Sequence, residues 1–128
     1  MCDDEAPIRL VVSQKLAAAG YRVSLARTGR EGYDLVVGPA GLRPDLVLTD
    51  FQMPVMSGLE LCKALRSLEA TANTPVLMLT ARGYTIDPAD LAKTNIREVI
   101  AKPFGLKQLL ERVQAVLAST ASDRREAA

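Results

Sequence analysis

Two short, continuous runs of apolar residues constrain the fold of this chain more than any other feature. Residues 46–48 (Leu-Val-Leu) and 76–79 (Val-Leu-Met-Leu) each follow a turn that contains proline, and each ends at a polar residue. Runs of this length are typical of strands that are covered on both faces, as in a parallel sheet. Residues 22–26 and 98–101 are weaker strand candidates.

The segments between these runs carry helix signals. Thr28 with Glu31 fits the capping box that begins a helix, and so does Ser57 with Glu60. Asp87 precedes a proline that suits a first helical position. The apolar residues of the last segment recur at helical spacing on one face, namely Leu106, Leu109, Leu110, Val113, Val116 and Leu117.

A further helix over residues 8–16 precedes Gly20, so helix and strand signals alternate along the whole chain. This alternation predicts an α/β fold with a doubly wound parallel sheet and helices on both faces. The length of 128 residues suits one domain. We predict a domain over residues 1–118 and a polar C-terminal tail over residues 119–128 that frays.

Composition excludes several classes of function. Lys and Arg total 16 against 15 for Asp and Glu, which disfavours a direct nucleic-acid or membrane-surface binder. The chain has no His, and Cys2 lies far from Cys62, so a zinc site or a Ser-His or Cys-His catalytic pair is not expected. No apolar run approaches the roughly 20 residues of a membrane helix. We expect a cytoplasmic protein with two free thiols.

Charged and hydroxyl side chains stand at or just beyond the expected strand ends: Asp50, Thr80, Lys102 and the pair Asp3-Asp4. The carboxyl ends of parallel strands meet at one edge, where ligands bind. Two carboxylates about 4 Å apart repel by roughly 4 kcal/mol at an effective dielectric of about 20. A hard divalent cation with oxygen ligands relieves this repulsion, which predicts Mg²⁺. Asp50 is the natural nucleophile for a phosphoryl group, whose charge Mg²⁺, Lys102 and Thr80 would share.

The segment LVLTDFQMPVMSG, residues 46–58, resembles the phosphorylation loop of bacterial response regulator receiver domains, and its Asp-x-x-Met-Pro-x-Met-x-Gly pattern is highly specific. Asp3-Asp4-Glu5 resembles the acidic pair of that family, Leu79-Thr80-Ala81 its strand-four threonine, and Ala101-Lys102-Pro103-Phe104 its Lys-Pro-Phe turn. The resemblance runs from residue 3 to about residue 117. It implies a flavodoxin-like, five-stranded receiver domain.

The resemblance also implies a role for each residue. Asp50 would take the phosphoryl group from a sensor histidine kinase or phosphotransfer protein, and Thr80 and Lys102 would bind phosphoryl oxygens. The domain would then switch the binding of an unknown output partner. It would not be an enzyme, beyond slow phosphorylation and dephosphorylation of itself.

The implied Mg²⁺ site has four members. Asp4 would bind the ion directly, Asp3 largely through water, Asp50 through its carboxylate and Gln52 through its backbone carbonyl. The peptide bond between Lys102 and Pro103 would be cis, which is plausible before proline.

The chain departs from the family pattern at two places. The switch position three residues before Lys102 is usually aromatic but is Val99 here, and we expect Tyr84 to report the state instead. The first strand is reduced to Met1 and Cys2, where strands usually run about 5–6 residues. We therefore expect either that the natural protein begins upstream, or that the acidic pair is poorly anchored.

Two alternatives remain open. The first is a receiver-like protein-interaction domain that is not phosphorylated. The second is a Mg²⁺-dependent phosphatase of related fold, which would normally carry a second Asp where this chain has Gln52. The sequence allows both a stand-alone receiver and one cut from a larger protein.

Overall fold

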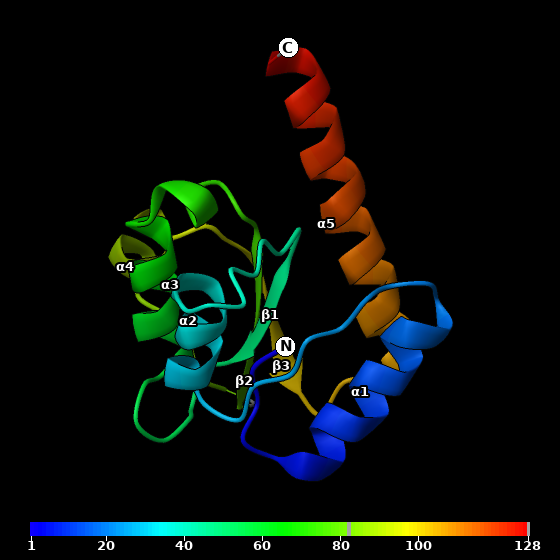
Figure 1. The fold of residues 1–128 in the computed structure, drawn as a ribbon. Coiled ribbons are helices and arrows are strands. Elements are labelled where there is room, and N and C mark those ends of the chain that lie inside the picture. Colours follow the sequence, from blue (N-terminus) through cyan, green and yellow to red (C-terminus); the bar gives the residue numbers. More distant parts are fainter. Residues whose placement is uncertain (82, 128) are drawn as a thin grey trace.

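The computed structural model describes the backbone of residues 1–81 and 83–127, and side chains as far as Thr120. Helices and strands alternate along it (Figure 1). In chain order they are α1 (Ala6–Ala18), α2 (Gly29–Val37), β1 (Val47–Asp50), α3 (Gly58–Arg66), the 3-10 helix η1 (Glu69–Thr71), β2 (Val76–Ala81), α4 (Pro88–Ala92), β3 (Ile96–Lys102) and α5 (Leu106–Ala127). The α/β class is confirmed.

The three strands form a parallel sheet in the order β1-β2-β3. Asp50 lies opposite Leu79 in this register, and Lys102 lies opposite Ala81. The carboxyl ends of all three strands therefore meet at one edge. Each residue of β2 from Val76 to Thr80 is buried, because β2 has a strand on either side and helices on both faces.

The expected five-stranded sheet is not confirmed among the described residues. Residues 22–25 form no strand; Ala26 forms only an isolated parallel bridge with Cys2, which in turn bridges Thr49. The physical reason is the short chain start, since residues 21–25 have only Met1–Asp3 beside them to pair with.

The short start is nevertheless held on both sides. The Cys2 N–H donates to the Leu48 carbonyl at 2.8 Å, and the Asp3 N–H donates to the Ala26 carbonyl at 3.1 Å. Asp3 is fully buried. The expectation of a poorly anchored acidic pair is therefore wrong for Asp3.

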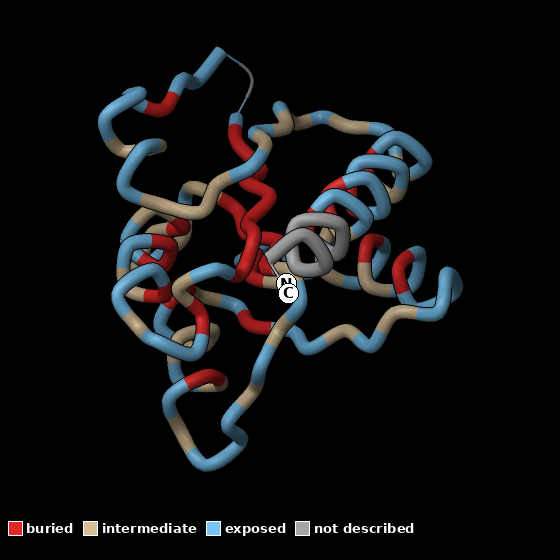
Figure 2. The backbone as a smooth tube through the Cα atoms, turned by 90° about the horizontal axis from the view of Figure 1, so that it is seen from above, coloured by how far each residue is buried: buried red, intermediate tan, exposed pale blue. Residues whose placement is uncertain are grey.

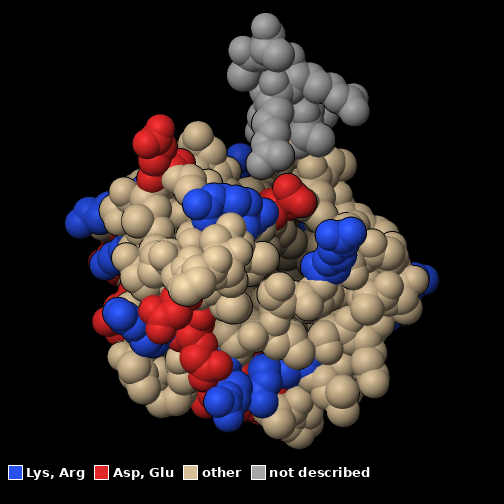
Figure 3. Space-filling model, in the orientation of Figure 1, with Lys and Arg blue, Asp and Glu red and all other residues tan. Residues whose placement is uncertain are grey.

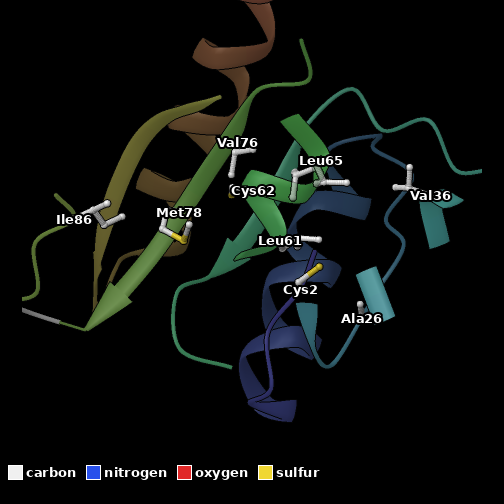
Figure 4. Close-up of a cluster of buried hydrophobic side chains, with 10 residues drawn as sticks. Cys2, Ala26, Val36, Leu61, Cys62, Leu65, Val76, Met78 and Ile86 are labelled. Atoms are coloured by element: carbon white, nitrogen blue, oxygen red, sulfur yellow. The ribbon is translucent and has the colours of Figure 1, made fainter. Parts of the chain in front are cut away.

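Two apolar cores lie on opposite faces of the sheet, which confirms the doubly wound arrangement. Helices α2 and α3 cover one face, where they pack against Cys2, Val47 and Met78. Figure 4 shows Cys2 and Met78 among the side chains of this cluster. Helices α1 and α5 cover the other face, where they pack against Leu48, Leu77 and Leu79. Buried residues accordingly concentrate in the centre of the molecule when it is viewed from above (Figure 2).

The helices begin where the sequence predicts. Ser57 and Glu60 form a complete reciprocal capping box at α3. The Thr28 hydroxyl accepts the Glu31 N–H at 3.1 Å, and the Asp87 carboxylate accepts the Ala89 N–H at 2.8 Å. Helix α5 continues through residues 119–127, so the boundary at residue 118 remains a prediction. None of the described helices is long and apolar enough to cross a membrane.

Candidate functional site

Four carboxylates meet at the carboxyl edge of the sheet. One oxygen from each of Asp3, Asp4, Glu5 and Asp50 lies within 4.8 Å of the others. Asp3 and Asp50 are buried, whereas Asp4 and Glu5 are exposed. The cluster is thus buried on the side of Asp3 and Asp50 and open to solvent on the side of Asp4 and Glu5. Hard carboxylate oxygens in such an arrangement fit the ligand preference of Mg²⁺.

Asp3 is held by contacts to the beginning of α1. One of its carboxylate oxygens accepts the Glu5 N–H at 2.9 Å, and its backbone carbonyl accepts the Arg9 guanidinium at 2.7 Å. Its second carboxylate oxygen lies 3.2 Å from the Lys102 ammonium. Both carboxylate oxygens and the backbone carbonyl of Asp3 therefore have partners, and these contacts hold the side chain in one orientation at the site.

Lys102 extends from the end of β3 into the carboxylate cluster. Its ammonium lies 2.9 Å from Glu5, 3.2 Å from Asp3 and 3.3 Å from Asp50. Burial by itself would lower the pKa of Lys102, but the hydrogen bond to Glu5 and the charges of Asp3 and Asp50 outweigh it and raise the pKa. The lysine is therefore a stable cation beside Asp50. The peptide bond that follows it is cis, as the resemblance to receiver domains implies.

The loop after β1 holds Asp50 in place through its backbone. The Phe51 N–H donates to the Leu79 carbonyl at 2.8 Å, and the Gly58 N–H donates to the Phe51 carbonyl at 2.9 Å. A Cβ at Gly58 would collide with the Asp50 carbonyl oxygen, so this position of the loop requires glycine. Val55 has a φ of 70° and is 83% exposed. A β-branched residue rarely adopts this left-handed conformation.

The environment of Asp50 disfavours its charged form. Burial raises its pKa first of all, and the neighbouring Asp3 charge raises it further, while Lys102 opposes both. The Lys102 ammonium therefore does not fully offset the burial of Asp50 and the charge of Asp3. A cation bound among Asp3, Asp4 and Asp50 would supply the missing compensation.

Thr80 lies one residue beyond the partner of Asp50 on the neighbouring strand and is buried. Its hydroxyl donates to the carbonyl of Ala81 at 2.9 Å. The threonine is thus at the correct edge of the sheet, but its hydroxyl proton is directed at the backbone. Binding a phosphoryl oxygen would require the hydroxyl to rotate.

The structure brings Asp3, Asp4, Asp50 and Lys102 into one cluster, with Thr80 at the end of the adjacent strand. The part expected of the Gln52 carbonyl remains a prediction. Sequence reasoning gave no role to Glu5, although this residue joins the cluster. The signal was the third consecutive acidic residue after Cys2.

Two other residues that the sequence singled out lie beside this edge. Val99 is 41% exposed on β3, which has a solvated face. The Tyr84 ring lies 4.5 Å, centroid to centroid, from the ring of Phe51, the residue that follows Asp50. An aromatic contact thus joins the loop after Asp50 to the loop after Thr80.

The cysteines take no part in the site. Both are free and buried in the core that Figure 4 shows. Burial raises the pKa of the Cys62 thiol to about 12, and it raises that of Cys2 as well. Neither thiol is therefore an effective nucleophile near neutral pH.

Comparison with known proteins agrees with the site geometry. The family model described as "Response regulator receiver domain" matches residues 1–114. The phosphate regulon transcriptional regulatory protein PhoB of Pseudomonas aeruginosa is 35% identical over 98% of this chain and 53% of its own length. The response regulator MprA of Mycolicibacterium vanbaalenii is 38% identical over 94% of this chain and 50% of its own length. The chain thus spans about half the length of these relatives.

A solved structure gives the same result for the fold. Chemotaxis response regulator CheY4 of Vibrio cholerae superposes with a TM-score of 0.78 and 35% sequence identity, covering 90% of this chain and 93% of that one. Since the family match spans most of the chain and includes every residue of the carboxylate and lysine cluster, this chain belongs to the response regulator receiver domain family.

Proposed function

We propose that this domain is a phosphorylation switch in which Asp50 accepts the phosphoryl group. The observation that carries the proposal is the position of the Asp50 carboxylate, inside the acidic cluster and 3.3 Å from the Lys102 ammonium. A carboxylate in this setting can attack phosphorus, and the ammonium stabilises the charge that develops on the phosphoryl oxygens.

The donor would be a phosphohistidine of a sensor histidine kinase or phosphotransfer protein. An Asp50 carboxylate oxygen forms a bond to phosphorus while the bond between phosphorus and the donor's imidazole nitrogen breaks. The nitrogen keeps the electron pair and takes up a proton from solvent. The proposal places this exchange in the cytoplasm, whose reducing conditions suit two free thiols.

The acidic residues fit a divalent cation because their donors are hard oxygens grouped within 4.8 Å. Asp3, Asp4 and Asp50 would hold Mg²⁺, together with the Gln52 carbonyl. The ion supplies charge neutralisation that lets an anionic phosphoryl group approach a carboxylate. The protein's own contribution is to hold Asp3 by its bonds to Glu5 and Arg9.

The switch would then act through groups that meet the new phosphoryl oxygens. Lys102 would turn toward them, and the Thr80 hydroxyl would leave the Ala81 carbonyl to donate to one of them. Movement at Thr80 would displace the loop that carries Tyr84, which contacts Phe51. The output partner would recognise this displacement.

The test is incubation with acetyl phosphate and Mg²⁺, followed by intact-mass measurement. Uptake of one phosphoryl group by the natural chain, and none by Asp50→Asn, is the expected result. Unchanged uptake in Asp50→Asn would refute the assignment. No uptake by the natural chain would favour the interaction domain, and rapid turnover of the donor would favour the phosphatase.

A further inference from the structure

Lys102 has one more acidic partner than the proposed reaction uses. Asp3 and Asp50 belong to the expected site, but the shortest of the three ion pairs, at 2.9 Å, is made with Glu5. Glu5 is also the most exposed of the three carboxylates, with 55% of its side chain accessible. The ion pair between Lys102 and Glu5 has no role in the proposed phosphoryl transfer.

The position of Glu5 in the chain makes the contact notable. Glu5 is the N-cap residue of α1, but its side chain makes no capping hydrogen bond to that helix. Its carboxylate reaches instead to Lys102, which lies 97 residues further along the chain. The local helix therefore does not account for the direction of the Glu5 side chain, whereas the charge of the lysine does.

Resting on the proposed function, we infer that Glu5 is a positioning residue that retains the Lys102 ammonium in the unphosphorylated state. To bind a phosphoryl oxygen, the ammonium must give up part of its present contacts. The pair with Asp3 is buried on the carboxylate side, so it is the less easily broken one. The pair with Glu5 faces solvent and is weak enough to be released on phosphorylation.

This role predicts the direction in which loss of the Glu5 charge changes the rate of phosphorylation. Removing the Glu5 charge frees the lysine for the incoming phosphoryl group, so phosphorylation becomes faster. If Glu5 instead helped to bind the metal, removing it would weaken Mg²⁺ binding and make phosphorylation slower. The two roles therefore differ in direction as well as in size.

The experiment measures the rate of phosphate uptake from acetyl phosphate in Mg²⁺ by intact mass. Glu5→Gln should react roughly two- to fivefold faster than the natural chain, which is the size expected from loss of one partly exposed ion pair. Glu69→Gln removes one exposed negative charge on η1, outside the cluster, and should react at the natural rate.

Glu5→Asp separates contact from charge. It keeps the negative charge but withdraws the carboxylate from Lys102 by one methylene group, so it should also react faster. A natural rate in Glu5→Asp would show that Glu5 acts only through its charge, and would overturn the inference. An unchanged or slower rate in Glu5→Gln would overturn it too.

The measurement also separates this inference from the proposed function. If the natural chain takes up phosphate on Asp50 and the Glu5 variants behave like it, only the role of Glu5 fails. If the natural chain takes up no phosphate at all, the proposed function fails and the role of Glu5 fails with it. Melting temperatures of all variants show whether a rate change comes from altered folding of α1.

Discussion

The two ends of the parallel sheet are built to different degrees of completeness. At the carboxyl end, residues from β1, β3 and the chain start fill one compact cluster of charged groups. At the amino end lies a cavity of about 720 Å³ beside Met1, with many apolar side chains in its wall. These include Leu16, Tyr21, Val23, Leu46, Leu48, Val113 and Leu117.

A longer first strand, continuing upstream of Met1 between residues 21–25 and Leu46, would run along this cavity. Only Met1–Asp3 pass between residues 21–26 and β1, and the Met1 ammonium donates to the Ser24 carbonyl at 2.7 Å. Burial lowers the pKa of this amino group, so its charge is held at a cost. The three residues Met1–Asp3 thus suffice to anchor Asp3, although they leave a cavity at the amino end of the sheet.

The charged side chains at the carboxyl edge of the sheet also differ from those on the rest of the surface. Lys and Arg are intermixed with Asp and Glu on the face that Figure 3 shows, and ion pairs such as Lys63–Asp90 between α3 and α4 are partly exposed. Such pairs contribute little to stability. At the carboxyl edge, by contrast, Asp3 and Asp50 are buried beside a single lysine. Buried charge is therefore concentrated where the proposed chemistry needs it.

The largest effect should come from disturbing the packing at the carboxyl end of the sheet. Gly58→Ala places a methyl group against the Asp50 carbonyl oxygen, and we expect a loss of about 3 kcal/mol, at the upper end of overpacking costs. Gly105→Ala is the matched control, because its nearest contact would be 4.0 Å away. The measurement is denaturant unfolding. Equal stability of the two variants would contradict the argument for Gly58.

The next largest effect should come from lengthening the first strand at the amino end of the sheet. A five-residue apolar segment added before Cys2 would pair with residues 21–25 and β1 and fill the cavity. A few additional hydrogen bonds at about 0.5–1.5 kcal/mol each give a gain of about 2 kcal/mol. The melting temperature should rise. A Gly-Ser segment of equal length is the control, and a similar rise with that segment would contradict the strand interpretation.

A smaller gain in stability should come from removing the buried charge of Asp50 at the carboxyl end of the sheet. The folded state raises the pKa of Asp50, so its contribution to stability is fully present below the unfolded pKa of roughly 3.9 and is lost as pH rises through the folded pKa. Asp50→Asn should therefore melt higher than the natural chain in the absence of Mg²⁺, by an amount that grows from acidic to neutral pH.

Each kcal/mol of added stability raises the melting temperature by roughly 3–5 °C in a domain of this size, so the difference between the two proteins is measurable by thermal unfolding. The pH series is its own control, because both proteins should behave alike where Asp50 is protonated. A lower melting temperature for Asp50→Asn at neutral pH would mean that the pairing of Asp50 with Lys102 outweighs its burial.

The smallest effect should come from the aromatic contact near the site. Tyr84→Ala removes the ring that lies against Phe51 and should cost about 0.5–1.5 kcal/mol. Tyr84→Phe keeps the ring and serves as the control. We also expect Tyr84→Ala to reduce the phosphorylation-induced change in the amide NMR spectrum. A full spectral response in Tyr84→Ala would remove Tyr84 from the switch.

Much of the fold was readable from local patterns. The buried run at residues 76–79 predicted β2 because a strand covered on both faces has to be apolar throughout. Ser57 and Glu60 predicted the beginning of α3 because a capping box satisfies backbone groups within a few residues. The prediction failed at residues 22–26, where forming a strand depends on a partner that is distant in sequence.

The sequence by itself determined which residues stand at strand ends, because alternation and turn signals act over short distances. It therefore identified Asp50, Thr80, Lys102 and the acidic pair as candidates. Only the tertiary structure decided that Asp3 is buried, that Glu5 shares Lys102 with Asp3 and Asp50, and that a cavity lies beside Met1. These features depend on contacts between residues nearly a hundred positions apart, and no local pattern encodes how charges and volumes match across such distances.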